Sequence, residues 1–289
     1  MQFGTVCIVG PGLIGGSIGL GLKKRNLAKT ITGVGHRSAS IDNALKLCAI
    51  DIGTLNIEEA VKSADIVILA TAVNQIVHIA KKAIPFMKSN AILTDVGSTK
   101  NYIVEQITNN LRKNITFIGA HPIAGSEQRG VEFASPDLFE GSTCIITPSN
   151  NGKEALETIT SMWQLLGAQT IYLSPEQHDE ILAFVSHLPH MVASCLTNSI
   201  KKDYIAYGAS GLRDTTRIAS GDPELWMNIF DQNRESMLKS IDKFLTELTE
   251  FRNALLKKNN NAVFDRLKQA KLLRDTVFSN TPNKQISGK

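Results

Sequence analysis

The sequence is poor in cysteine, has no long apolar run and has no cluster of basic residues. Its cysteines are Cys7, Cys48, Cys144 and Cys195. They form no C-x-x-C pair, and a chain of 289 residues needs no disulfides to hold a core, so we expect buried thiols in a reducing compartment. The longest apolar stretch, near residues 66–73, is too short to cross a bilayer, and the N-terminus carries no basic leader. These absences predict a soluble, cytoplasmic protein.

The charge is nearly balanced, with 31 basic and 27 acidic residues and a formal net charge of +4. This small excess favours anionic small molecules only weakly and gives no support for a nucleic-acid surface. Apolar residues make up 43% of the chain, which is enough for one or two cores, and the length is typical of two domains.

Short β-rich runs alternate with helical stretches in the first part of the chain. The predicted strands are Thr5–Val9, Thr30–Val34, Ile66–Leu69, Ala91–Asp95, Thr116–Ala120, Thr143–Thr147 and Thr170–Leu173. Most are continuous apolar runs, typical of parallel strands covered on both faces. Residues 1–173 are therefore predicted to form an α/β domain of the Rossmann type, with a doubly wound parallel sheet.

The strand signals stop after Ser174-Pro175. Apolar residues then recur at steps of three and four over positions 237–255 and again over 263–277, which predicts two amphipathic helices. We therefore expect residues 174–289 to form an all-helical domain.

A glycine-rich turn follows the first predicted strand. Gly10-Pro11-Gly12-Leu13-Ile14-Gly15 matches G-x-G-x-x-G and opens a predicted helix. In this pattern Gly10 makes the tight turn, Gly12 lets the backbone approach a pyrophosphate, and Gly15 allows the helix to pack on the strand. Free N–H groups of the helix N-terminus, with Leu13 and Ile14, would bind the pyrophosphate, and we assign Thr71 to the same site. A turn that merely connects strand and helix is the alternative.

The end of the second predicted strand bears on the choice of cofactor. An NAD site usually has Asp or Glu there, but this segment reads Gly35-His36-Arg37-Ser38. Arg37, with His36 beside it, would attract a 2′-phosphate, which a carboxylate would repel. We therefore assign His36, Arg37 and Ser38 to the cofactor site and favour NADP, with NAD as the alternative. An ordinary solvated loop charge is the other interpretation of Arg37.

Five further motifs occur in order along the chain. They are Asp95-Val96-Gly97-Ser98-Thr99-Lys100, His121-Pro122-Ile123-Ala124-Gly125-Ser126-Glu127, Ser186-His187-Leu188-Pro189-His190, Gly211-Leu212-Arg213-Asp214-Thr215-Thr216-Arg217-Ile218-Ala219 and Asp222-Pro223-Glu224-Leu225-Trp226. Together with the glycine turn, this set resembles the prephenate/arogenate dehydrogenase family of tyrosine biosynthesis over roughly residues 3–278.

The resemblance implies an oxidative decarboxylation of prephenate to 4-hydroxyphenylpyruvate. A hydride goes to NADP or NAD, and the ring carboxylate leaves as carbon dioxide. His121 matches the family's catalytic histidine, which accepts the hydroxyl proton, a role worth on the order of 10²–10⁴-fold in rate. Ser98 matches the serine that bonds this histidine near the nicotinamide, and we predict it to be catalytic too.

The same resemblance implies a substrate site in the helical part. Its predicted residues are Arg217, His190, His187, Glu127, Ser126 and, with a weaker claim, Arg213. A planar guanidinium suits the carboxylates of prephenate, and His190 favours prephenate over arogenate. His187 and His190 would share one helix face, but no H-E-x-x-H motif or nearby carboxylate completes a metal site, so we predict no metal.

Relatives in this family are homodimers with interlocking helical domains, so we expect a helical dimerisation domain. The expected partners are a small-molecule substrate and a second copy of the chain, with neither nucleic acid nor membrane. Three alternatives stay open: an arogenate dehydrogenase, an oxidoreductase of the β-hydroxyacid dehydrogenase or imine reductase type, and a non-catalytic NADP(H)-binding sensor.

Overall fold

The computed structural model describes residues 2–125, 128–148 and 152–279. The chain divides into two compact units, a large unit of Met1–Met237 and a small unit of Leu238–Lys289.

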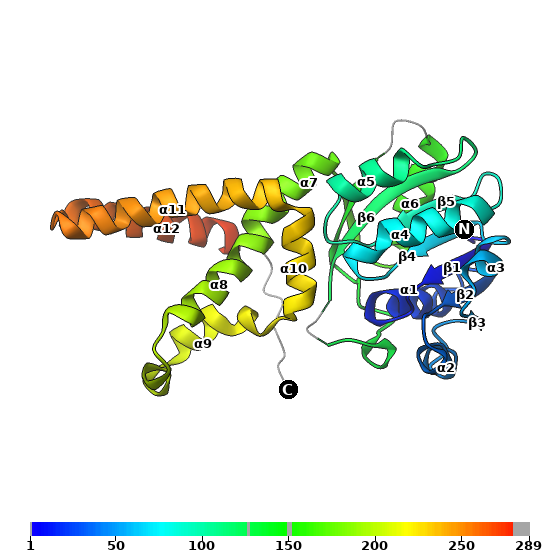
Figure 1. Ribbon diagram of the computed structural model, residues 1–289, viewed down its shortest axis with the longest axis horizontal. Coiled ribbons are helices and arrows are strands. Elements are labelled where there is room, and N and C mark those ends of the chain that lie inside the picture. The colour runs from blue at the N-terminus through cyan, green and yellow to red at the C-terminus, as the bar shows by residue number, and fades with distance from the viewer. Residues whose placement is uncertain (1, 126–127, 149–151, 280–289) are drawn as a thin grey trace. The chain divides into compact units, whose positions relative to one another are not determined.

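Eight strands form one sheet in the described part of the large unit (Figure 1). They are β1 (Thr5–Val9), β2 (Thr30–Val34), β3 (Ile52–Thr54), β4 (Ile66–Leu69), β5 (Ile92–Asp95), β6 (Thr116–Ile123), β7 (Thr143–Thr147) and β8 (Gln169–Tyr172). Their order is β3-β2-β1-β4-β5-β6-β7-β8, and every pair is parallel except β6 with β7. The predicted doubly wound α/β sheet is confirmed.

The sheet differs from the prediction in one additional strand, one longer strand and one strand direction, and in shifts of one residue at the ends of β5 and β8. Strand β3 was not predicted, because a three-residue run with Gly53 at its centre carries no periodicity. Strand β6 continues three residues beyond Ala120 to Ile123, so that His121 lies within the strand. Strand β7 runs antiparallel to β6, and the described part of the connection between them contains a 3-10 turn at Val131–Phe133 in place of the crossover helix typical of a parallel pair.

The helices before β8 cover both faces of the sheet. They are α1 (Leu13–Lys24), α2 (Ser38–Lys46), α3 (Ile57–Val61), α4 (Val73–Ala83), α5 (Asn101–Thr108) and α6 (Lys153–Leu165), with short 3-10 turns η1 (Ile84–Phe86) and η2 (Val131–Phe133). Successive residues of a strand point to opposite faces, so β1 contributes to two cores. Ile8 packs in one core with residues of α1, and Cys7 packs in the other with residues of α4.

Described secondary structure after β8 is entirely helical. The elements are α7 (Pro175–Leu182), the π-helix η3 (Ala183–His187), α8 (Leu188–Ser199), η4 (Lys202–Tyr207), α9 (Ser210–Thr216), η5 (Arg217–Ser220), α10 (Pro223–Gln232), α11 (Arg234–Leu256) and α12 (Asn260–Ser279). Ser174 begins α7 with a capping box closed by Gln177. Across residues 2–125, 128–148 and 152–279, none of the helices combines the length and the apolar character needed to cross a membrane.

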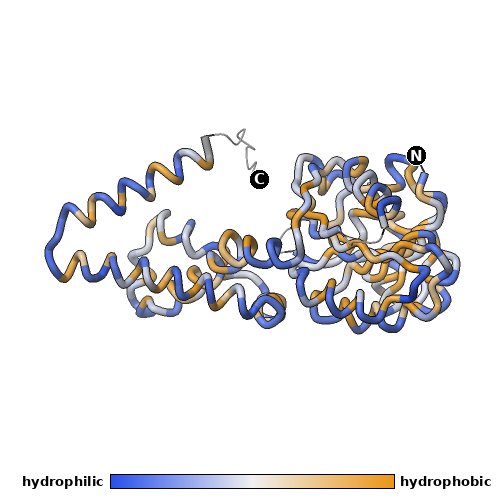
Figure 2. Tube along the Cα trace, turned by 90° about the horizontal axis from the view of Figure 1, so that it is seen from above, coloured by the Kyte–Doolittle hydropathy of each residue, from blue (hydrophilic) through white to orange (hydrophobic). Residues whose placement is uncertain are grey.

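The small unit is a helical hairpin. Arg266 of α12 forms ion pairs with Glu247 and Glu250 of α11, which hold the two helices together. Hydrophilic and hydrophobic residues alternate along both helices (Figure 2). Many of their large apolar side chains are nevertheless exposed, among them Leu245, Leu248 and Leu267.

The expectation of four buried thiols is wrong for two of the cysteines. Cys7 and Cys144 are buried in the sheet, but Cys48 and Cys195 are exposed. Cys48 adopts a positive φ of 57° in the turn after α2, and Cys195 lies on the outer side of α8. Sequence spacing alone could not distinguish these environments, because a cysteine is small enough for either.

A buried ion pair fixes the end of β5 to the neighbouring strand. Lys100 Nζ lies 2.5 Å from Asp95 Oδ2, and both side chains are fully buried. Asp95 also accepts hydrogen bonds from the backbone N–H of Gly97, at 2.9 Å, and of Ala120, at 3.3 Å. Since Ala120 directly precedes His121, this carboxylate holds the loop after β5 against the segment of β6 that carries the histidine.

Removing the cation of this pair should be far more damaging than removing one at the surface. Lys100→Met leaves the Asp95 carboxylate buried and uncompensated, and we expect the free energy of unfolding to fall by about 3–5 kcal/mol. Lys23→Met is the matched control, because Lys23 pairs with Asp51 at 2.6 Å in a partly exposed position and should contribute less than about 1 kcal/mol. Urea titrations followed by circular dichroism measure both. Equal losses for the two variants would contradict the structural role given to Lys100.

Candidate active site

The glycine turn between β1 and α1 is shaped by steric limits. Gly10 has φ 90°, and a Cβ added there would lie 2.6 Å from the carbonyl oxygen of Ala70. A Cβ on Gly15 would collide with the carbonyl oxygen of Gly10 and lie 2.9 Å from Ile8. A Cβ on Gly12 would meet nothing within 4 Å. The backbone is therefore tightly packed on one side and open on the other, which is the form of a cradle.

The residues around this cradle fit a nicotinamide dinucleotide. Gly12 is the N-cap of α1, whose first turn, with Leu13 and Ile14, contains no acidic side chain that would repel a pyrophosphate. Thr71 follows β4, and its Oγ1 is buried without a hydrogen-bond partner among the described residues. A buried hydroxyl without a partner is costly, so a bound polar group at this point would satisfy it.

His36, Arg37 and Ser38 lie beside the cradle. The N–H of Gly10 donates to the carbonyl oxygen of Val34, at the end of β2, which brings the two segments together at 2.8 Å. All three side chains are exposed, and Arg37 is the N-cap residue of α2. The Arg37 guanidinium forms no ion pair or hydrogen bond with any residue that the structure describes, so it is available to an anionic ligand.

His121 lies in β6, one strand beyond β5. Its Nδ1 is 2.8 Å from Nε2 of His178, a residue of α7 that the sequence analysis did not identify. Ser98 lies in the loop after β5 and is partly buried, and the described residues form no hydrogen bond between it and His121. The catalytic role of Ser98 stays a prediction.

A chain of hydrogen bonds continues behind His121. His178 Nδ1 lies 2.7 Å from Asp179 Oδ1. The Asp179 carboxylate also accepts the backbone N–H groups of Lys100, at 2.7 Å, and Asn101, at 2.9 Å, at the start of α5. His178 is fully buried and Asp179 is 3% exposed, so the chain runs through the interior.

The surroundings keep His121 neutral. Burial, followed by the nearby His178, Lys100 and His187, lowers the pKa of His121 well below its ordinary value. Burial also lowers the pKa of His178, although its hydrogen bond to Asp179 opposes this effect. Two adjacent imidazoles are therefore uncharged at neutral pH, and the ring of His121 can accept a proton.

His187 and His190 lie together in the helical part of the large unit. The ring of His190 stacks on Trp226 with centroids 3.7 Å apart, and its Nδ1 is buried without a partner among the described residues. His187 Nδ1 lies 3.2 Å from Nδ2 of Asn233, which also donates to the backbone oxygen of Asp179 at 2.7 Å. Burial lowers the pKa of His187 to about 4. These contacts connect the predicted substrate residues to the chain behind His121.

The predicted arginines lie on the neighbouring segment. Arg213 is in α9 and Arg217 begins η5, and both side chains are exposed. Gly221, just after η5, packs so closely that a Cβ there would lie 2.9 Å from His190 Cε1. The segment that carries Arg217 is thus held beside the stacked ring of His190. Ser126 and Glu127, also predicted for the substrate site, lie outside the described residues.

Sequence reasoning missed three residues of this network: His178, Asp179 and Asn233. A signal was present in α7, whose buried face consists of His178, Asp179 and Leu182. An imidazole and a carboxylate on the buried face of a helix need hydrogen-bond partners inside the protein. That pattern could have indicated an internal polar site, but its partner on β6 could not be found without the fold.

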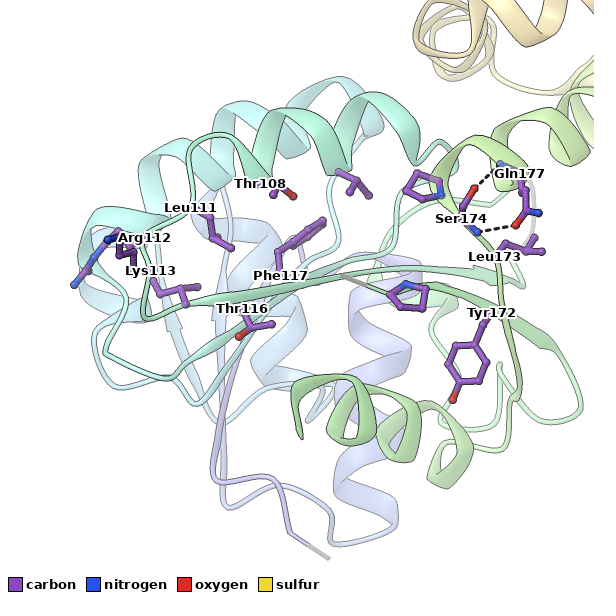
Figure 3. A pocket seen from close by; sticks show the side chains of 14 residues that line it. Thr108, Leu111, Arg112, Lys113, Thr116, Phe117, Tyr172, Leu173, Ser174 and Gln177 are labelled. Atoms are coloured by element: carbon purple, nitrogen blue, oxygen red, sulfur yellow. Dashed lines mark hydrogen bonds between the residues drawn. The ribbon is translucent and has the colours of Figure 1, made fainter. Parts of the chain in front are cut away.

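None of the residues in the hydrogen-bonded network of His121 lines the pocket of about 850 Å³ in Figure 3. It is lined by Thr108, Leu111 and Arg112 near the end of α5, by Thr116 and Phe117 of β6, and by Tyr172 of β8, among others. Thr116 and Phe117 are the first residues of β6, whereas His121 lies near the opposite end of this strand. None of the predicted site residues lines this pocket.

Comparisons with known proteins agree with this arrangement. The family described as "Prephenate dehydrogenase, nucleotide-binding domain" matches residues 18–172, and "Prephenate dehydrogenase, dimerization domain" matches residues 174–269. The prephenate dehydrogenase of Bacillus subtilis is 35% identical over 94% of this chain and 75% of its own length. The cyclohexadienyl dehydrogenase of Zymomonas mobilis is 29% identical over 94% of this chain and 95% of its own length.

Solved structures of prephenate and arogenate dehydrogenases also resemble this chain over most of its length. The Aquifex aeolicus prephenate dehydrogenase in complex with hydroxyphenyl propionate and NAD+ has a TM-score of 0.89 and 34% identity, covering 96% of this chain and 98% of that one. The Synechocystis arogenate dehydrogenase has a TM-score of 0.84 and 28% identity, covering 94% and 99%. A Mycobacterium tuberculosis 3-hydroxyisobutyrate dehydrogenase, at 13% identity and a TM-score of 0.53 over 78% and 73%, shares the fold alone. The chain therefore belongs to the prephenate dehydrogenase family of nicotinamide-dependent oxidoreductases.

Proposed function

We propose that this protein catalyses the oxidative decarboxylation of prephenate to 4-hydroxyphenylpyruvate. The observation that carries the proposal is the neutral ring of His121, which is held through Nδ1 and leaves Nε2 for a substrate. The family to which the protein belongs supports the same reaction, as do its relatives in Bacillus subtilis and Aquifex aeolicus, both of which are named prephenate dehydrogenases.

In the proposed reaction His121 Nε2 accepts the proton of the ring hydroxyl. As this proton leaves, the oxygen gains electron density, which favours departure of hydride from the same carbon. Gly10, Gly12 and Gly15 would hold the dinucleotide, and its nicotinamide would supply the hydride acceptor. Loss of the ring carboxylate as carbon dioxide leaves its electron pair in the aromatic ring, and His121 returns the proton to the phenolic oxygen. Proton transfer by a positioned imidazole accounts for about 10²–10⁴-fold of the rate.

We assign substrate binding to Arg217, His190 and His187, with Arg213, Ser126 and Glu127 as further candidates. A guanidinium matches a carboxylate with two parallel hydrogen bonds. The buried Nδ1 of His190, without a described partner, gives this site a polar atom for the keto-acid side chain. Arogenate, which carries an amino acid side chain instead, is the second candidate substrate, because an arogenate dehydrogenase of Synechocystis has the same fold at 28% identity.

We propose NADP as the preferred cofactor. The support is local: Arg37 is exposed beside the glycine turn, and the segment from Gly35 to Ser38 contains no carboxylate. The NAD+ bound to the Aquifex aeolicus relative keeps NAD as the alternative.

We also propose that the chain forms two domains with different functions. Residues 1–173 would bind the cofactor and residues 174–289 would bind substrate and form a homodimer in the cytoplasm. The predicted cofactor residues all precede position 173, and the part matching the dimerization domain begins at 174. Exposed apolar side chains on α11 and α12, such as Leu248 and Leu267, are available to a second copy.

The proposed reaction is tested with two substrates and two nucleotides. Purified protein mixed with prephenate and NADP should produce absorbance of the reduced nicotinamide, with smaller rates for arogenate and for NAD. Carbon dioxide release in equal amount confirms the decarboxylation. Folded protein that reduces neither nucleotide with either substrate refutes the proposal.

The pH dependence of the reaction should reflect the environment of His121. Because its lowered pKa keeps the ring neutral, kcat/KM should stay constant from neutral pH down past about 6.5, the ordinary value for histidine, and should fall only below it. Steady-state rates between pH 5 and 8 give the profile. In His121→Asn, kcat should drop by about 10²–10⁴-fold while cofactor affinity is retained. An acidic limb centred at 6.5 or above contradicts the prediction.

The preference for NADP should depend on Arg37. Arg37→Ala removes the cation that would pair with the 2′-phosphate, so Kd for NADP should rise by at least about tenfold, the equivalent of one charge-assisted hydrogen bond. Kd for NAD, which lacks this phosphate, should change less than about twofold. Nucleotide titrations by calorimetry give both values, and Lys46→Ala, at the other end of α2, is a surface-charge control. Equal effects on the two nucleotides argue against the role of Arg37.

A further inference from the structure

We propose that His178 and Asp179 are positioning residues that fix the tautomer of His121, so that Nδ1 carries its hydrogen and Nε2 is the basic atom. The consequence for catalysis rests on the proposed function, but the tautomer itself is a property of the protein alone.

Asp179 sets the direction of the chain. Its Oδ1 accepts the backbone N–H of Lys100 at 2.7 Å, and its Oδ2 accepts that of Asn101 at 2.9 Å. Both oxygens thus face donors that cannot act as acceptors, and the carboxylate is itself an acceptor. The 2.7 Å contact between Oδ1 and His178 therefore requires a hydrogen on Nδ1 of His178.

The direction then passes to His121. A neutral imidazole with its hydrogen on Nδ1 has a lone pair on Nε2. His178 Nε2 lies 2.8 Å from His121 Nδ1, so His121 must be the donor in this bond. Neutral His121 consequently has its hydrogen on Nδ1 and its lone pair on Nε2, the ring nitrogen that does not take part in the hydrogen bond to His178. The second hydrogen bond of an imidazole sets its tautomer in the same way in other enzymes.

Burial makes the arrangement rigid. His178 is fully buried, Asp179 is 3% exposed, and the N-terminus of α5 stabilises the negative charge that it receives. The other charged and titratable groups near the rings have partners of their own. Lys100 Nζ is paired with Asp95, and His187 is held by Asn233. Neither group supplies an acceptor that could replace His178 at Nδ1 of His121.

His178 and Asp179 also stabilise the positive charge that develops on His121. When Nε2 accepts the substrate proton, the ring becomes an imidazolium, and its Nδ1–H bond to His178 becomes a charge-assisted bond. The Asp179 carboxylate offsets this positive charge through the ring of His178. When the proton returns to the product oxygen, the chain regains its original hydrogens, so no other proton donor or acceptor is required.

The tautomer can be measured without cofactor or substrate. Two-bond 1H–15N correlations at pH 7.5 distinguish protonated from unprotonated ring nitrogens in the labelled protein. We expect hydrogen on Nδ1 of both His121 and His178, with His121→Asn and His178→Gln used to assign the signals. A hydrogen on Nε2 of His121 in the wild-type protein would falsify the proposal, whatever reaction the protein catalyses.

Two variants of His178 connect the tautomer to turnover. His178→Gln retains a side-chain oxygen that can accept from His121, whereas His178→Phe fills the space without an acceptor. For His178→Phe we expect kcat to fall by on the order of 10- to 100-fold, with KM within about threefold because His178 is fully buried behind His121. His121 should then show hydrogen on Nε2. His178→Gln should retain the Nδ1 hydrogen and turn over faster than His178→Phe.

Ser174→Ala is the matched control for a purely structural role of α7. It breaks the capping box at the start of this helix without touching the chain of hydrogen bonds. We expect a lower melting temperature with wild-type kcat and an unchanged His121 tautomer. Wild-type kcat and pH profile in His178→Phe overturn the proposal, and if that variant does not fold, the wild-type spectrum and His178→Gln still decide. A wild-type protein that does not oxidise prephenate refutes the proposed function, while the spectra continue to test the tautomer.

Discussion

The bond between His121 and His178 is the contact on which the candidate site depends. It joins β6 to α7, the first helix after β8, through two residues separated by 57 positions in the sequence. Strand β6 alone gives the imidazole a place but no fixed orientation, because a ring on a strand can rotate about its side-chain bonds. Helix α7 supplies the second point of attachment.

Such a contact is stable only if the rest of the buried polar groups are satisfied. A buried polar group without a partner costs about 1–3 kcal/mol, and a buried charge costs more. Two carboxylates are buried in the part of the chain that the structure describes, those of Asp95 and Asp179. Each accepts hydrogen bonds from the segment between β5 and the start of α5, in addition to one from Ala120 to Asp95 and one from His178 to Asp179. That one short loop therefore supports both carboxylates. Lys100 can be fully buried because its charged Nζ is paired with the Asp95 carboxylate.

The sequence predicts the fold well where periodicity and turn chemistry are strong. The apolar strands, the glycine turn and the amphipathic pattern of α11 are local signals, and each was found where it was expected. The extra strand β3 was missed because three residues are too few for a pattern. The partner of His121 was missed for another reason: a hydrogen bond between residues 121 and 178 depends on how α7 lies on the sheet, and no local pattern encodes that. The family resemblance implied one connection, a bond between Ser98 and His121, which the described residues do not form, and it did not indicate the bond from His121 to His178.

Helix α10 extends the same dependence to the substrate side. Its Trp226 carries the stacked ring of His190, and its last residue, Gln232, bonds both to Thr99 at 2.7 Å and to the backbone oxygen of Val73 at 3.1 Å. Val73 follows Thr71 after β4, and Thr99 follows Ser98 after β5. Gln232 therefore connects the helix that carries Trp226 to the two segments that hold the predicted residues Thr71 and Ser98. Because Ile229 on the same helix is buried in the core beside α4, α10 cannot shift without disturbing both sides. Hydride transfer requires the donor carbon and its acceptor to be held at a defined separation, and this helix provides a rigid connection between the elements that would hold them.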